Sequence, residues 1–384
     1  MTARTRAAGL SLIEMMIALV IGLVLLLGVI QVFSASRTAF QLSEGASRAQ
    51  ENARFALDFL ARDIRMAGHF GCVNDQAHFV KGQGDPRVNL STTTGSGSPL
   101  DFSVSIQGYE ATGTSPGAQL RLGGTLSPAA GVPSQIQGLN PAPLPGSDIL
   151  VLRFLSPEGV PVTGLVRTGS NSIASFDAGR LSRLTSGGVG TPTLFGIADC
   201  SHADVFTGTS AASSVTTSVD LSRYTAQPTG QTMLYRAESL VYYVGTGASG
   251  EPALRRARAA SDGTYAQNEE LVEGIESLQL LYGLDSTAII SSATPPVGNI
   301  MSQLTASAVG ASADAAGANQ WRRVGAVQVG ILARSPNTAN AVATANDDPV
   351  GVLGVSMQPP SAPDGRYRAS YELSIALRNR LFGN

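Results

Sequence analysis

One carboxylate in this chain stands out because of where it lies. Glu14 stands directly before an apolar run: residues 15–30 are Met, Ile, Ala, Leu, Val and Gly only, and no charge follows until Arg37. An ionisable group at the edge of such a segment costs about 2.5–3.5 kcal/mol on membrane-insertion scales, so it needs a partner or a purpose. The chemistry that Glu14 indicates is charge pairing in an apolar environment, because a charge there is stable only when it is paired.

Cysteine and histidine offer a second chemistry. The chain has two cysteines, Cys72 and Cys200, and an even pair in an exported protein favours a disulfide. That bond would close a loop of about 130 residues and tie the end of the N-terminal helix to the rest of the chain. His69 precedes Cys72 by three residues and His202 follows Cys200 by two, which is also compatible with a tetrahedral zinc site. We favour the disulfide, with zinc and free thiols as the alternatives.

Motifs for catalysis are weak. Residues 245–250 read GTGASG, but the dinucleotide fingerprint GxGxxG needs a helix next and an acid about 20 residues on. Here Glu251-Pro252 and a strand-like stretch follow, which favours a hairpin loop. The chain has three histidines, no GxSxG elbow, no phosphate-binding loop and no dense carboxylate cluster. We therefore predict no enzyme activity, no catalytic residue, no cofactor and no metal.

The element that positions Glu14 is a membrane-spanning helix. About 20 apolar residues in a helix cross a hydrocarbon core of about 30 Å. Arg4 and Arg6 precede the run without an acid, which places the N-terminus in the cytoplasm and the bulk of the chain outside. A cleaved secretory signal ending near Ala35 would need a shorter apolar core. A plain membrane anchor leaves Glu14 unexplained.

The helix continues beyond the membrane. Residues 34–66 contain no Pro and a single Gly, and apolar residues recur there at three- and four-residue spacing. This predicts one helix from about Leu10 to about Met66, ending at Ala67-Gly68 and about 85 Å long. Residues 10–36 form its transmembrane or filament-core half, and residues 37–68 form an amphipathic half that packs on a head.

Composition predicts that the head, residues 69–384, is rich in strands and loops. The chain has 43 Gly and 20 Pro, with 14% charged and 6% aromatic residues. A net charge of −2 argues against a nucleic-acid-binding surface, which would need a basic excess. The fold class is α+β, with the long helix packed on an antiparallel sheet in one lobe or two. The run Arg255-Arg256-Ala257-Arg258 is interpreted as a solvated strand or turn.

Strand signals come in clusters. Residues 271–276 read as a short helix or turn, and four stretches (82–147, 157–232, 284–320 and 335–365) read as loops or insertions. The predicted strands cover residues 149–155, 234–235, 239–244, 254–256, 277–282, 327–331 and 367–378.

The N-terminus resembles a type IV prepilin signal. Gly9 is followed by Leu10-Ser11-Leu12-Ile13-Glu14, after a basic leader and before the apolar helix. The resemblance implies that a prepilin peptidase removes the leader, residues 1–9, by cutting between Gly9 and Leu10, and then methylates the Leu10 amine. It also implies that Glu14 pairs with that amine of a neighbouring subunit. Leu10 is a less usual first residue than Phe or Met.

Further strings resemble PilW-type minor pilins: residues 61–72, 234–236, 271–283 and 327–332. The resemblance implies a low-abundance pilin that starts or caps a type IV pilus. Its helix would lie in the lipid of the bacterial inner membrane, with its head in the periplasm. The partners implied are the major pilin, other minor pilins and a large tip adhesin. The 271–283 string is also close to what minor pseudopilins of type II secretion carry, although Glu14 argues against the tip pseudopilin. An unprocessed single-pass anchor or binding protein is the remaining alternative.

Overall fold

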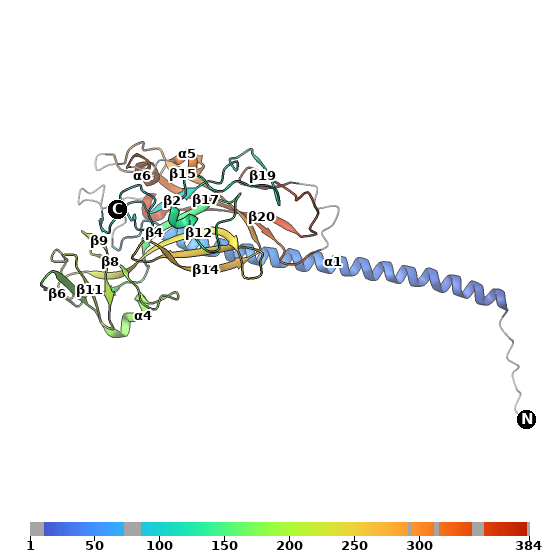
Figure 1. Cartoon of the computed structure of the whole chain (residues 1–384), viewed down its shortest axis with the longest axis horizontal. Coiled ribbons are helices and arrows are strands. Elements are labelled where there is room, and N and C mark those ends of the chain that lie inside the picture. The colour runs from blue at the N-terminus through green and yellow to red at the C-terminus, as the bar shows by residue number, and fades with distance from the viewer. Residues whose placement is uncertain (1–10, 73–85, 291–293, 311–314, 340–348, 382–384) are drawn as a thin grey trace, which may run out of the picture.

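A long helix and a β-rich head make up the molecule (Figure 1). The structure is a computed structural model that describes residues 11–72, 86–290, 294–310, 315–339 and 349–381. Helix α1 (Leu12–Met66) is continuous, and its first half projects from the head while its second half lies against it. The predicted helix and the α+β class with a pilin-like arrangement are therefore confirmed, and Leu10 lies outside the described residues.

Helix α1 ends at the predicted residues. Ala67 is the C-cap, and its N–H donates to the carbonyl oxygen of Ile64 (3.1 Å). Gly68 follows with a φ of 78°, a conformation that glycine adopts without the steric cost of a Cβ. The turn carries the chain back into the head, where Phe70 is fully buried.

Small residues bring the second half of α1 close to the head. Ala49, Ala53 and Ala56 are fully buried, and Leu60 and Ile64 extend the same stripe toward the helix end. Their three- and four-residue spacing places them on one face of the helix. This face shares one hydrophobic core with strands from two sheets, so the amphipathic half is embedded in the head.

Within the described residues, the largest sheet has nine strands arranged around β12. β12 pairs with β4 along one edge and β13 along the other, and its first residues pair with β8 and β5. Leu240 and Tyr242 face the core that contains α1, whereas Val241 and Tyr243 face the opposite side. The strands are β1 (Arg87–Asn89), β2 (Ile106–Tyr109), β4 (Ile149–Leu155), β5 (Val160–Pro161), β8 (Leu194–Ala198), β9 (Ala203–Thr207), β12 (Met233–Thr246), β13 (Pro252–Ala259) and β14 (Tyr265–Glu273).

A second, antiparallel sheet in the order β16-β15-β17-β20 completes the core around α1. Its strands are β15 (Ile275–Asp285), β16 (Ile300–Leu304), β17 (Val324–Arg334) and β20 (Arg368–Ala376). A small sheet holds β3 (Gln119–Arg121), β18 (Val350–Val352) and β19 (Val355–Gln358). The short helices are α3 (Ser134–Gln137), the 3-10 turn η1 (Ala178–Arg180), α4 (Leu181–Leu184), α5 (Ala306–Val309), α6 (Ala315–Arg322) and α7 (Arg378–Leu381).

Residues 160–232, here called the side lobe, project from the head beside the larger sheet (green in Figure 1). The lobe has its own core, and strand β8 joins it to the rest of the head. Phe195 and Ile197 of β8 face the lobe core, whereas Leu194 and Ala198 face the other side. The hydrophobic core of the side lobe is therefore separate from the core around α1. The sheet of the side lobe holds β6 (Gly164–Thr168), β7 (Asn171–Ser175), β10 (Thr209–Ser210) and β11 (Ser214–Thr217).

The four stretches predicted as loops were wrong in part, because each contains strands. These strands are two to five residues long, and several are mostly polar. In β11, for example, Val215 is the one apolar residue among Ser and Thr. Such strands show too little apolar alternation to be found from sequence.

The prediction of a short helix or turn at 271–276 was also wrong. Leu271 to Glu273 end β14, and Ile275 begins β15. Gly274 forms the corner between them with a φ of 79°, and a Cβ there would lie 2.8 Å from the carbonyl oxygen of Arg334. The glycine is required by its backbone conformation and by this close approach.

A buried carboxylate, Asp148, links the two sheets. Its Oδ1 accepts the N–H of Ala111 (2.8 Å) and its Oδ2 accepts the N–H of Leu280 (2.9 Å). Burial raises the pKa of Asp148 to about 8, and the nearby Glu110 carboxylate acts in the same direction against the two backbone hydrogen bonds. The Asp148 carboxyl group is therefore mostly protonated at neutral pH.

Asp148 makes the stability of the head depend on pH. The unfolded chain releases this proton near pH 3.9, whereas the folded protein holds it to about pH 8. Stability that is present below pH 4 is thus lost as the pH rises toward 8. We expect the free energy of unfolding, relative to that of Asp148→Asn, to fall by up to about 1.4 kcal/mol per pH unit across this window. Urea unfolding of the full chain in detergent micelles measures this slope; exposed Asp58→Asn is the control, and a flat difference would contradict the assignment.

Candidate functional site

The first half of α1 is an apolar surface that the head leaves uncovered. Its large apolar side chains from Leu12 to Phe33 are between 51% and 79% exposed. By length and composition the helix can cross a membrane. An apolar surface of this size is unstable in water, so lipid or other helices must cover it.

Glu14 has a local role that the sequence analysis missed. Ser11 is the N-cap of α1: its Oγ accepts the N–H of Ile13 (3.2 Å), and its own N–H donates to Glu14 Oε2 (3.0 Å). This is a capping box, and the spacing Ser11-x-x-Glu14 was the signal that could have predicted it. The structure thus places Glu14 at the exposed start of the helix. Gly9 and Leu10, the predicted cleavage residues, lie outside the described part of the chain.

A buried polar cluster around Asp63 ties α1 to the head. Asp63 is 8% exposed and accepts hydrogen bonds from the Tyr242 hydroxyl group and from Arg256 Nη1 (3.0 Å). Burial raises the pKa of Tyr242 well above its usual value of 10, and the Asp63 carboxylate raises it further, so the hydroxyl stays protonated and donates. Arg256 also pairs with Glu269 (2.6 Å). One carboxylate of α1 is therefore connected to β12, β13 and β14.

The interpretation of Arg255 to Arg258 as a solvated strand or turn was wrong in one respect. The run is in strand β13, but the side chains of Arg256 and Arg258 are only 16% and 13% exposed. Both point to the α1 side of the sheet, since β13 pairs Arg256 with Tyr242 and Arg258 with Leu240. Their carboxylate partners come from α1 and from neighbouring strands, so the short run itself did not reveal them.

Cys72 and Cys200 are joined in a disulfide. It connects the chain just beyond α1 to the segment between β8 and β9. His69 donates from Nδ1 to the carbonyl oxygen of Leu155 (2.8 Å), and burial lowers the pKa of its imidazole. With both sulfurs bonded to each other, the arrangement favours the disulfide over the zinc alternative. No group of three or more His, Cys, Asp or Glu side chains is assembled for a metal among the described residues.

The glycine-rich stretch 245–250 connects β12 to β13 as a hairpin loop. The Gly247 N–H donates to the carbonyl oxygen of Glu251 (2.7 Å), which closes the turn. Strand β13 follows directly, so the helix required by a dinucleotide fingerprint is replaced by a strand.

A half-exposed apolar helix embedded in an antiparallel β head defines a pilin-like protein. Residues 241–379 match the family described as Type IV Pilus-assembly protein W, and residues 4–30 match the Prokaryotic N-terminal methylation motif. The resemblance to PilW-type minor pilins is thereby confirmed. Among solved structures the chain is similar to a type IV-like pilin from Thermus thermophilus, at 14% identity over 58% of this chain and 86% of that one, with a TM-score of 0.20. Comparison with curated proteins finds no match.

The Asp63 cluster predicts a measurable loss of stability. Asp63→Ala removes the acceptor of a buried hydroxyl group and one partner of a buried guanidinium group, so we expect a loss of about 3 kcal/mol in the free energy of unfolding. Asp58→Ala, an exposed substitution on the same helix, should change it by less than about 0.5 kcal/mol. Urea unfolding of both variants decides the matter: equal effects would show that Asp63 does not anchor α1.

Proposed function

We propose that this chain is a minor pilin that takes part in starting or capping a type IV pilus, with other pilins as its partners. The observation that supports this most is the division of α1 into a bare apolar half and an embedded half. Before assembly the bare half would cross the bacterial inner membrane once, with the head in the periplasm. In the filament, helices of neighbouring subunits would cover it.

Processing would create the charge that Glu14 needs. Cleavage by a prepilin peptidase between Gly9 and Leu10 would remove the leader and expose an amine on Leu10, which the peptidase would methylate. The Glu14 carboxylate, which accepts the Ser11 N–H in the described part of the chain, would then pair with that amine of a neighbouring subunit. The pair would set the register of an incoming subunit. A large adhesin at the pilus tip is a further proposed partner. The work of the chain is assembly, without a catalysed reaction.

The mass of the N-terminal peptide tests the processing step. Protein taken from its native membrane should give a peptide that begins at methylated Leu10. A peptide that begins at Met1 would instead indicate an unprocessed anchor, and one that begins near Ser36 a secreted protein; either outcome excludes a pilin.

Glu14→Gln separates the charge of Glu14 from its capping role. Glutamine can occupy the same position of a capping box, so the helix should still begin at the same residue. Because the charge is gone, we expect cells that carry only this variant to lose most surface pili while retaining the protein in the membrane. Pili are counted by electron microscopy and the protein by immunoblot.

Ser11→Ala is the matched control, because it removes the N-cap side chain but keeps the carboxylate. It should cost about 1 kcal/mol of helix stability and leave piliation close to wild type. Normal piliation with Glu14→Gln would disprove the pairing mechanism. A loss of protein secretion with intact pili would identify a type II secretion pseudopilin instead.

A further inference from the structure

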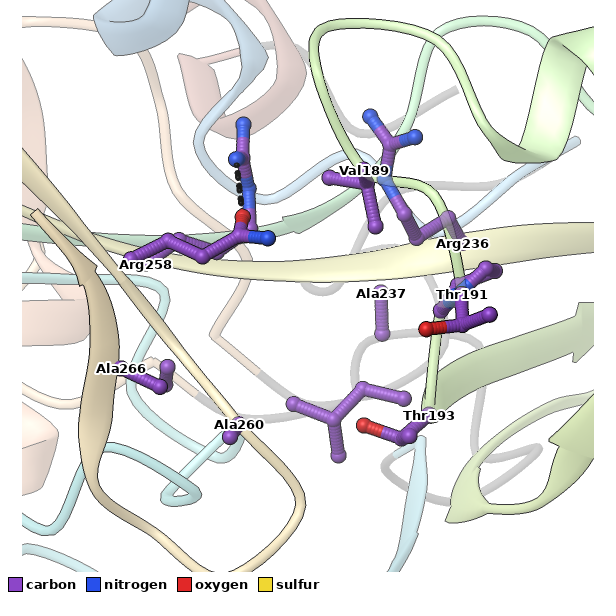
Figure 2. Close-up of a pocket in the computed structure, with 12 residues that line it drawn as sticks. Val189, Thr191, Thr193, Arg236, Ala237, Arg258, Ala260 and Ala266 are labelled. Carbon is purple, nitrogen blue, oxygen red and sulfur yellow. Dashed lines mark hydrogen bonds between the residues drawn. The ribbon is translucent and has the colours of Figure 1, made fainter. Parts of the chain in front are cut away.

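A cavity of about 350 Å³ lies where the end of α1, strands β12 and β13 and the side lobe meet. A second cavity, of about 170 Å³, lies beside it (Figure 2). Arg236 of β12 and Arg258 of β13 line both. Figure 2 shows the two side chains extending to the same side of the sheet. We call the larger of these spaces the arginine cavity.

Arg236 and Arg258 share one carboxylate, Glu238. Its Oε1 accepts Arg236 Nε (2.6 Å) and its Oε2 accepts Arg258 Nε (2.7 Å). The side chains of Arg236, Arg258 and Glu238 are 7%, 13% and 4% exposed. Two cations and one anion thus leave one positive charge in a place that water reaches poorly. Such a charge is costly unless a further anion pairs with it.

The other charged side chains around the arginine cavity do not remove this local surplus. Four arginines and three acids line it: Arg62, Arg236, Arg256, Arg258, Asp63, Glu158 and Glu238. Glu269, the second partner of Arg256, is 48% exposed and lies outside the lining. Asp63 is already bonded to Arg256 and Tyr242, so it does not neutralise the pair of arginines at the other end.

The guanidinium donors in the cavity are only partly used. Arg236 uses four of its five N–H donors: its Nε and Nη2 contact Glu238, and its Nη1 donates to the carbonyl oxygens of Leu184 (2.6 Å) and Ser186 (2.7 Å). Arg258 donates from Nη1 to Gln267 (2.9 Å), and its Nη2 has no hydrogen-bond acceptor within the described ranges. Arg258 Nη2 is therefore a nitrogen whose two N–H groups a ligand can use.

The missing side chain of Gly187 leaves room for that ligand. A Cβ built on Gly187 would lie 3.9 Å from Arg236 Nη2 and 4.0 Å from Arg258 Nη2, and nothing else would lie within 4 Å. The two nitrogens thus converge on one unfilled point beneath the side lobe. The φ of 68° at Gly187 disfavours other residues at this position.

We propose that the arginine cavity binds one carboxylate, from an acidic side chain of a partner protein. A single negative charge balances the one positive charge that Arg236, Arg258 and Glu238 leave, whereas a phosphate group would bring about −1.5 to −2. Arg258 Nη2 donates to the carboxylate, and Arg62, exposed at the end of α1, lies at the rim. The identity of the partner as another pilus subunit rests on the proposed function; the binding of a carboxylate does not.

Thermal unfolding of the full chain in detergent micelles tests the proposal. The probes are the capped tripeptide Ala-Glu-Ala, the same peptide with Gln in place of Glu, and inorganic phosphate. We expect the Glu peptide to raise the midpoint of unfolding in a saturable way, because it binds the folded state. The Gln peptide should leave the midpoint unchanged, and phosphate should raise it less than the Glu peptide does.

Three variants locate the binding. Arg258→Gln leaves Glu238 paired with Arg236, so the head should fold, and the apparent affinity for the Glu peptide should fall at least about tenfold. Arg62→Gln changes an exposed residue at the rim and should weaken binding several-fold without affecting the fold. Arg54→Gln, exposed on the same helix but outside the cavity, should bind as the wild type does.

The outcomes decide between clear alternatives. No shift with the Glu peptide, an equal shift with the Gln peptide, or unchanged binding in both Arg258→Gln and Arg62→Gln would each overturn the proposal. A shift with phosphate as large as that with the Glu peptide would reduce the cavity to a general anion site and overturn the carboxylate assignment. These measurements need no pilus, so their result is independent of whether the chain assembles into one.

Discussion

Helix α1 is one continuous helix whose two halves lie in different environments. Its first half exposes apolar side chains that only lipid or other helices can cover, whereas its second half is embedded in the head. Any lateral contact on the first half is therefore transmitted to the head through the embedded half. The stripe of Ala49, Ala53 and Ala56 permits close packing, but alanine buries little apolar area. Interactions other than apolar burial therefore help to hold the embedded half against the head.

The Asp63 cluster and the disulfide supply those interactions at the end of the helix. Buried ion pairs contribute little net stability against apolar alternatives, but removing one partner is costly, so they fix orientation more than they add energy. Asp63 fixes the helix against β12 and β13, and Cys72 holds the chain just beyond it to Cys200 in the side lobe. The helix end is thus constrained on both sides of the turn at Gly68.

The sequence predicted what depends on local signals. The length of α1 and its end at Ala67-Gly68 followed from the apolar run, the absence of proline and a glycine C-cap. The side lobe was not predicted, because the strands of its own sheet (β6, β7, β10 and β11) are short and mostly polar. Its core residues are also scattered over 75 positions, from Val160 to Leu234. The buried arginines were misjudged for a different reason: Asp63 lies 193 residues before its partner Arg256, and no local pattern brings them together. The capping box at Ser11 and Glu14 is a local sequence pattern. It was not predicted, because Glu14 was interpreted only as a charge that pairs with a neighbouring subunit.

The arginines on one face of β12 and β13 fall into two groups with different numbers of carboxylate partners. One group holds the helix, and the other is available to bind a partner. Arg256 has two carboxylates and holds α1, whereas Arg236 and Arg258 share one carboxylate and face the side lobe. The segment that matches the PilW family contains Arg256 and Arg258 but not the side lobe. Gly187 of the side lobe lines the arginine cavity. Because the core of the lobe is separate from the core around α1, changes in the lobe can reshape the cavity while the helix stays embedded. We therefore expect the residues that select a partner to lie at the junction of the side lobe with β12 and β13. There the lobe can change without weakening the contact between α1 and the head.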